Sequence, residues 1–158
     1  MSLPTAIAVA QHSPHEIASS VTLGGEHESD ATLYLRFPAG SADRALLLAW
    51  LVLDLRESTR SSEPVTLEIG RARGPFSSGG LRPTEQPGLT PPLVEYRIES
   101  GATGPLRVNV TELVQYFERH AQRAPILAIR ARNTRGAGVT LSTGVDGGRA
   151  PRLDAYWR

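Results

Sequence analysis

The residues best suited to chemistry stand near the N-terminus, where three histidines lie close to two glutamates. His12, His15 and His27 with Glu26 and Glu28 form the one metal-like grouping in the sequence. None has the i, i+4 helical spacing that makes such a motif specific, so polar residues at strand ends explain them equally well. Glu26 and Glu28 could be proposed as an acid and base pair, but alternation puts both on one strand face, and charged residues at strand ends are much the commoner case. We therefore expect no transition-metal site.

Nucleophilic catalysis has no stronger support. Ser13, Ser19 and Ser20 lie near the first two histidines without an evident acid to orient an imidazole, and there is no Gly-x-Ser-x-Gly elbow. With Cys 0, thiolate nucleophiles, thiolate metal sites and disulfides are excluded. Gly136 and Gly138 lack the strand-to-helix setting of a phosphate loop and instead predict a hairpin turn. The sequence predicts a protein that catalyses nothing.

A hard cation is the remaining metal hypothesis. Backbone carbonyls together with Asp30 or Asp146 could hold calcium in a structural role. We expect no other cofactor.

Four arginines could serve recognition rather than catalysis. Arg130, Arg132 and Arg135, joined by Arg107, could line an exposed strand face and bind an anionic sugar, phosphate or carboxylate through forked hydrogen bonds. The alternative is a solvated strand face without a ligand. At the end of the chain, Tyr156 and Trp157 alternate, so at most one of them should be exposed, and an exposed aromatic ring could stack on a sugar.

The elements that must position these residues are mostly strands. Along 31–37, Leu33, Leu35 and Phe37 face one way and Tyr34 and Arg36 the other, as a half-buried strand requires. Segment 45–55 is apolar on both faces, which fits a buried helix or a doubly covered strand, and its period-two neighbours favour the strand. Further strands are expected at 5–11, 17–23, 65–69, 93–98, 106–110, 127–132, 138–142 and 153–157.

One helix, at about 111–122, interrupts the strands. Thr111 can cap it, Glu112 suits its positive first turn, and Pro125 prevents its continuation. Its apolar stripe consists of Leu113, Val114, Phe117 and Ala121. Short strands separated by Gly, Pro, Ser and Asp favour a sandwich or barrel over a βαβ fold. The Gly- and Pro-rich stretch 71–92 is expected to be a long loop with a function.

Length and composition fit one compact domain, residues 1–158. The hydrophobic fraction of 40% and charged fraction of 21% are those of an ordinary globular protein. A formal net charge of +1 predicts no nucleic-acid partner, and no apolar run is long enough for membrane insertion. All 17 basic residues are arginine, which codon bias explains as readily as function. The N-terminus does not have the features of a signal peptide.

Several segments resemble DNRLRE-type β-sandwich domains, a family found in bacterial surface and extracellular proteins. The similar segments are Leu33 to Phe37, the apolar strand Leu46 to Leu55, Val108 to Phe117, Leu141 to Gly144, and Pro151 to Leu153. The resemblance implies an all-β, jelly-roll-like antiparallel β-sandwich with one short helix, related to some carbohydrate-binding modules. Asn109 replaces the family's usual aspartate, and Gly74 to Ser77, which includes Phe76, stands for its tryptophan-containing segment.

The family normally occurs as one module of a long secreted protein, whereas this sequence begins with Met1 and ends at the closing strand. We therefore expect a non-catalytic structural or adhesive subunit of a virion, tail, fibre or exported surface appendage, with protein neighbours as partners. The alternative is a carbohydrate-binding module for an acidic polysaccharide. The candidate contact residues are Arg107, Arg130, Arg132, Arg135, Phe76 and Trp157.

Overall fold

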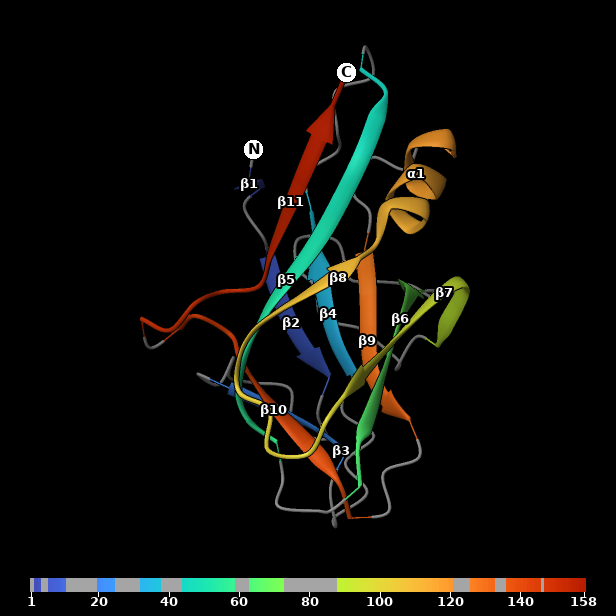
Figure 1. Cartoon of the computed structure of the whole chain (residues 1–158). Helices are drawn as coiled ribbons and strands as arrows, with labels where there is room; N and C mark the ends of the chain where they lie inside the picture. The colour runs from blue at the N-terminus through green and yellow to red at the C-terminus, as the bar shows by residue number, and fades with distance from the viewer. Residues whose placement is uncertain are drawn as a thin grey trace.

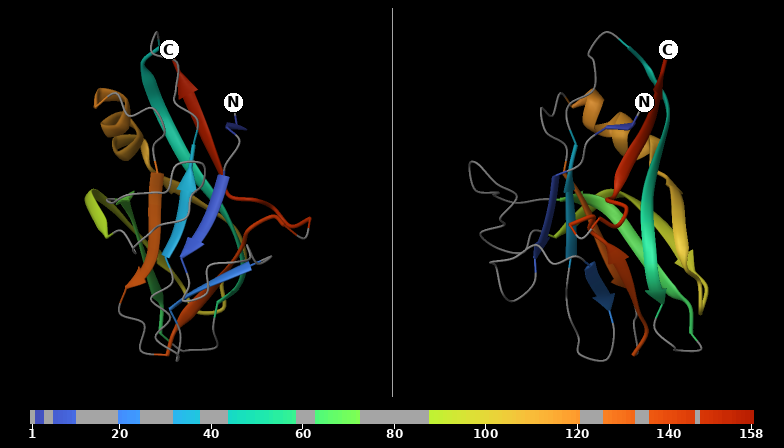
Figure 2. Two further views of the ribbon diagram at one scale, coloured as in Figure 1. Left: turned by 180° about the vertical axis from the view of Figure 1, so that it is seen from behind. Right: turned by 90° about the vertical axis from the view of Figure 1, so that its left-hand side faces the viewer.

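The computed structural model of the chain describes residues 2–3, 6–10, 20–24, 32–37, 44–58, 63–72, 88–120, 126–132, 136–145 and 147–158. Within these residues, two antiparallel sheets form two layers, and one helix lies at one end of them (Figures 1 and 2). The expected all-β sandwich with one short helix is confirmed.

Sheet A, the first layer, is organised around its longest strand. Both β11 and β10 pair with β5 on one side, at successive stretches of that strand, and β8 pairs with β5 on the other side. The outermost strands, β1 and β3, pair with β11 and β10. The strands are β1 (Ser2–Leu3), β3 (Ser20–Gly24), β5 (Leu46–Ser58), β8 (Gly104–Asn109), β10 (Gly138–Ser142) and β11 (Arg152–Trp157).

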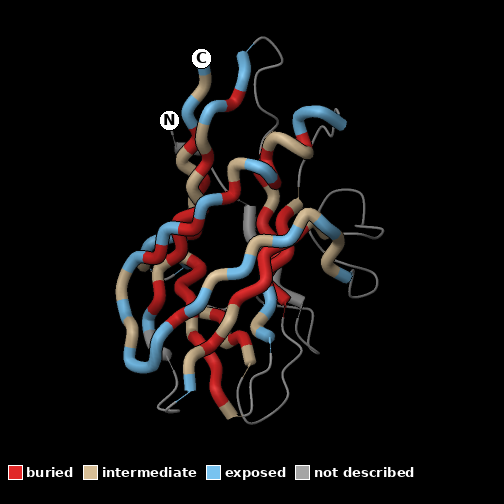
Figure 3. Tube along the Cα trace, turned by 45° about the vertical axis from the view of Figure 1, so that its right-hand side comes forward, coloured by how far each residue is buried: buried red, intermediate tan, exposed pale blue. Residues whose placement is uncertain are grey.

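Sheet B, the second layer, has the strand order β2-β4-β9-β6-β7. Its strands are β2 (Ala6–Ala10), β4 (Thr32–Arg36), β6 (Val65–Ala72), β7 (Leu89–Ile98) and β9 (Ile126–Arg132). Exposed and less exposed residues alternate along β7 and β8, as Figure 3 shows. Along such strands, successive side chains point alternately toward the core and toward the outer surface.

The core lies between the two sheets. Leu51, Leu53 and Leu55 of β5 face Leu33 and Leu35 of β4 across it, and all five are almost completely buried. Aliphatic side chains of this kind contribute about 1.5–3 kcal/mol each when fully buried. The inward-facing side chains that the period-two pattern predicts are therefore the ones that stabilise the fold.

The helix α1 (Thr111–Arg119) begins directly after β8 and ends earlier than expected. The prediction that Thr111 caps it is wrong, because Val110 occupies the N-cap position and Thr111 is the first helical residue. The Val110 carbonyl accepts the first helical bond, from Val114, rather than the ladder bond from the Ala49 N–H that a continued strand would have. Instead the Thr111 hydroxyl accepts the Ala49 N–H at 3.0 Å and joins the helix to β5.

Two further polar contacts and a buried apolar stripe fasten α1 to the strands. The Gln115 side-chain amide donates to the Leu46 carbonyl at 3.1 Å. The Arg71 guanidinium lies 4.0 Å from the centre of the Tyr116 ring, a cation–π contact with β6. Buried Leu113, Val114 and Phe117 confirm the predicted stripe as far as the structure describes it, whereas Ala121 lies outside the described residues.

The expected long loop 71–92 is shorter than predicted, because both of its ends are strand. Arg71 pairs with Thr90, and Ala72 with Leu89. Among the described strands β7 pairs only with β6, so its prolines stand on an edge strand, where a missing N–H is tolerated. Residues 73–87 lie outside the described part.

The prediction of a hairpin turn at Gly136 and Gly138 is also wrong. The strand before them, β9, pairs in sheet B, and the strand after them, β10, pairs in sheet A. These glycines therefore belong to a crossing between the layers. A glycine turn in sequence does not reveal whether its flanking strands pair with each other.

Tyr34 lies on the face of its strand opposite Leu33 and Leu35, and it is fully buried there, on the outer face of sheet B. Its ring packs with Ala128 and with Ala72, Leu89 and Ile126. Burial raises the pKa of the Tyr34 phenol above its usual value, and a hydrogen bond with the Thr32 side chain partly opposes this. Strand β4 is consequently covered on both faces at this point.

Candidate functional site

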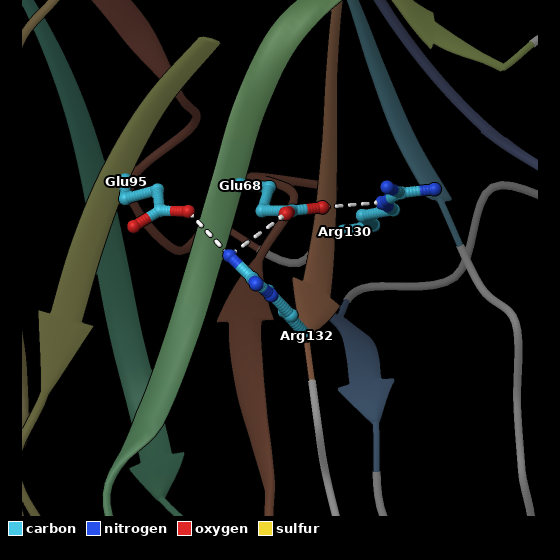
Figure 4. Close-up of polar contacts among 4 residues, drawn as sticks. All are labelled: Glu68, Glu95, Arg130 and Arg132. Carbon is cyan, nitrogen blue, oxygen red and sulfur yellow. Dashed lines mark hydrogen bonds and ion pairs between the residues drawn. The ribbon is translucent and has the colours of Figure 1, made fainter.

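Two of the predicted arginines, Arg130 and Arg132, lie on the outer face of sheet B within an ion-pair network (Figure 4). Arg130 Nε donates to Glu68 Oε2 at 2.7 Å. Arg132 Nη1 lies 3.6 Å from Glu68 Oε1 and donates to Glu95 Oε1 at 2.6 Å. Two cations and two carboxylates balance within this network, so Arg130 and Arg132 are already paired with carboxylates of the chain itself.

The network predicts a measurable stability effect at its buried member. Glu68→Gln keeps the shape of the side chain but removes the charge that accepts both arginine contacts, and the Glu68 side chain is only 8% exposed. Because hydrogen bonds to charged groups contribute more than neutral ones, we expect a loss of about 1–3 kcal/mol in the free energy of unfolding, measured by urea denaturation.

The matched control is Glu99→Gln. Glu99 forms a similar ion pair with Arg97, but the side chains of both residues are mostly exposed. Exposed pairs of this kind contribute roughly 0–1 kcal/mol. Equal losses in the two variants would show that burial gives the Glu68 network no special weight.

The prediction that Arg107 shares a face with the other arginines is wrong. Its strand, β8, pairs with β5 of sheet A, whereas β9 belongs to sheet B. On sheet A the Arg107 guanidinium lies 5.1 Å from the centre of the Trp50 ring, within cation–π range. The predicted four-arginine surface is therefore divided between two sides of the sandwich.

The exposed aromatic residue at the end of the chain is Tyr156, not Trp157. Trp157 packs against the core, and its indole N–H donates to Glu118 Oε1 of α1 at 3.2 Å. Tyr156 is 48% exposed and stands on the outer face of sheet A, opposite Leu48 of β5. Trp157 therefore supports α1, and Tyr156 replaces it as a candidate contact residue.

We name the outer patch as Leu47, Leu48, Trp50 and Tyr156. Leu47 is 57% exposed at a register shift of β5, and Leu48 and Trp50 are half-buried on the same outer face as Tyr156. No described helix or strand lies in front of this part of sheet A in Figure 1, and α1 lies on its inner side in Figure 2. Sequence reasoning assigned 45–55 to the core and missed this apolar surface.

A hollow of about 470 Å³ adjoins the outer patch where β8 becomes α1. It is lined by Leu47, Leu48, Val94, Asn109, Thr111 and Glu112. The Asn109 carboxamide oxygen accepts the Thr111 hydroxyl at 2.6 Å, which fixes the polar side of this wall. The hollow therefore combines aliphatic lining with a rim that carries one carboxylate.

Several predicted residues lie outside the described part of the chain. These are Phe76, Arg135, Asp30, Asp146, Ser13, Ser19 and the group His12, His15, His27, Glu26 and Glu28. Among the described residues, no three His, Cys, Asp or Glu side chains gather as a metal site would require. No described helix has both the length and the apolar character needed to span a membrane.

No protein-family model and no curated protein matches this chain. The resemblance to DNRLRE-type domains therefore stays a prediction.

Proposed function

We propose that this chain is a non-catalytic structural or adhesive subunit of a larger assembly, such as a phage-like virion, tail, fibre or surface appendage. The observation that carries the proposal is the outer patch. An aromatic and aliphatic surface on the flat outer face of a sheet is the kind of surface that protein neighbours cover.

The surroundings of the outer patch support protein contacts. Asp154 lies opposite Trp50 on one neighbouring strand, Asn109 on the other, and Arg107 sits over the Trp50 ring. A central apolar area with polar and charged residues around it matches the core and rim of protein interfaces. The tyrosine, tryptophan and arginine of this face are the residue types that contribute most to binding energy.

The experiment compares patch variants with a control in extracts of the native source. Leu48→Asp and Tyr156→Ser change the outer patch without removing a fully buried side chain. In size-exclusion chromatography, we expect the wild-type chain to elute with partners at a mass well above its own 17.0 kDa. In each variant the affinity for the partners should fall about tenfold, which corresponds to about 1.4 kcal/mol.

Val145→Ser is the control, because Val145 is 61% exposed and lies outside the outer patch. It should assemble like the wild type. A wild-type monomer with no co-purifying protein would contradict the proposal, as would a Leu48→Asp variant that assembles normally.

The second candidate is carbohydrate binding, and the exposure of Tyr156 on a flat sheet face favours it. The Arg130 and Arg132 pairs with carboxylates argue against an acidic polysaccharide on sheet B. A glycan array separates the candidates: sugar binding that Tyr156→Ser abolishes supports a carbohydrate-binding module, and an array without binding leaves the assembly proposal.

A further inference from the structure

The strand β8 has a free edge. It pairs with β5 and with no other described strand, and α1 follows it directly, with Val110 as the N-cap. A free strand edge presents unpaired backbone donors and acceptors, which can pair with another extended chain.

The register shows which backbone groups face outward. The Val110 N–H donates to the Ala49 carbonyl at 3.0 Å, and this bond flanks the Asn109–Trp50 pair. In an antiparallel ladder, a pair flanked in this way is a non-hydrogen-bonded pair, whose own N–H and C=O groups point away from the partner strand. The alternation extends this to Arg107 and Pro105, so Arg107 and Asn109 each present an N–H and a C=O.

A second copy of the chain fits this edge poorly. Two-fold antiparallel pairing that uses the outward groups would place Arg107 directly opposite the Arg107 of the other copy, and like charges in that position repel. Shifting the register by two residues in one direction would pair Arg107 with Pro105, which has no N–H to donate. Shifting it in the other direction would pair Arg107 with Asn109, but Pro105 would then lie opposite Thr111, which is helical, so this ladder would be very short. Each register of self-pairing is therefore repulsive, incomplete or short, whereas a strand of opposite charge meets none of these obstacles.

The hollow lies at the end of the same edge. Asn109, the last residue of β8 with outward backbone groups, lines it together with Thr111, and Val94 of β7 lines it from sheet B. Side chains of an added strand would alternate between the outer face, beside Arg107, and the inner side, toward β7. A strand with acidic and apolar residues in alternation would satisfy both environments.

We propose that the β8 edge binds an extended segment of a partner protein in which acidic and apolar residues alternate. The acidic residue pairs with Arg107, and an apolar residue enters the hollow formed by Leu47, Leu48 and Val94. This inference rests on the proposed function, because it names the kind of protein partner. Its surface shares Leu47 and Leu48 with the outer patch but does not include Tyr156.

The test is titration of the full chain with a capped eight-residue peptide of alternating valine and glutamate, followed by NMR. We expect shifts of the amide signals from Leu106 to Glu112 and slower hydrogen exchange of the Arg107 and Asn109 amides. Arg107→Glu should weaken binding about tenfold, because an attractive cross-strand pair becomes a repulsive one. A peptide with lysine for glutamate should then prefer the Arg107→Glu variant.

Two further comparisons keep the result specific. Leu47→Ser removes an exposed aliphatic wall of the hollow and should weaken peptide binding, whereas the Val145→Ser control should not. A peptide with alternate amides N-methylated on one edge should not bind, because it cannot complete the backbone ladder.

Absence of binding by the valine–glutamate peptide, or equal affinity for the wild type and Arg107→Glu, would overturn the inference. Tyr156→Ser should leave peptide binding unchanged, so the result is distinguishable from failure of the proposed function. If the peptide fails but Tyr156→Ser still abolishes assembly, only the β8 inference falls.

Discussion

Gly144→Ala is expected to cause one of the largest losses of stability among single substitutions in this chain. Gly144 has φ +86°, a left-handed conformation that costs about 1–2 kcal/mol for residues with a side chain. A Cβ there would also lie 2.6 Å from the Ala150 Cβ and 2.9 Å from its Cα. Since backbone must move to relieve this clash, we expect a total loss of about 3 kcal/mol or more, measured by urea denaturation.

Gly147→Ala is the matched control in the same connection. Gly147 has φ +81°, but nothing lies within 4 Å of a Cβ built on it. It should therefore lose only the conformational part, about 1–2 kcal/mol. Equal effects at the two glycines would mean that the close approach of Ala150 to Gly144 does not exist. That approach lets β11 follow β10 along the same side of β5, which places Tyr156 on the outer patch.

Leu113→Ala is the second large effect. Leu113 is completely buried in the stripe with which α1 joins the core. Its truncation leaves a cavity beneath the helix, so we expect a loss of about 2–5 kcal/mol in the free energy of unfolding.

The neighbouring Glu112→Ala is the control, because Glu112 is exposed and alanine is a good helix former. It loses only the favourable charge in the first turn, about 0.3–1 kcal/mol. A Leu113→Ala variant as stable as Glu112→Ala would show that α1 is not part of the core.

Most of the fold could be predicted because burial in a strand leaves a local period of two. Val65, Leu67 and Ile69 display it, and β6 is found there. The pairing of strands could not be predicted in the same way, since it depends on residues distant in sequence. For this reason Arg107 was predicted to share a face with Arg130 and Arg132. Its actual partner, Val52 of β5, is farther from it along the chain than β9 is, and nothing in the local pattern marks the pairing.

The candidate site was less accessible to sequence reasoning. Alternation already placed Trp157 with Leu153 and Ala155, on the side that proved to be the core, so the opposite position of Tyr156 could have been read from it. The exposure of Leu47 could not, because it follows from a register shift between β5 and β11. The ion pairs of Arg130 with Glu68 likewise depend on which strand lies beside β9.

The central claim is that the outer patch is covered by a protein neighbour. Hydroxyl-radical footprinting of the native assembly, compared with the isolated chain, tests it most directly, with exposed Val145 as the internal reference. The account predicts that Tyr156 and Leu47 lose most of their reactivity in the assembly while Val145 keeps its own. Equal reactivity of Tyr156 and Leu47 in the assembly and in the isolated chain would contradict it.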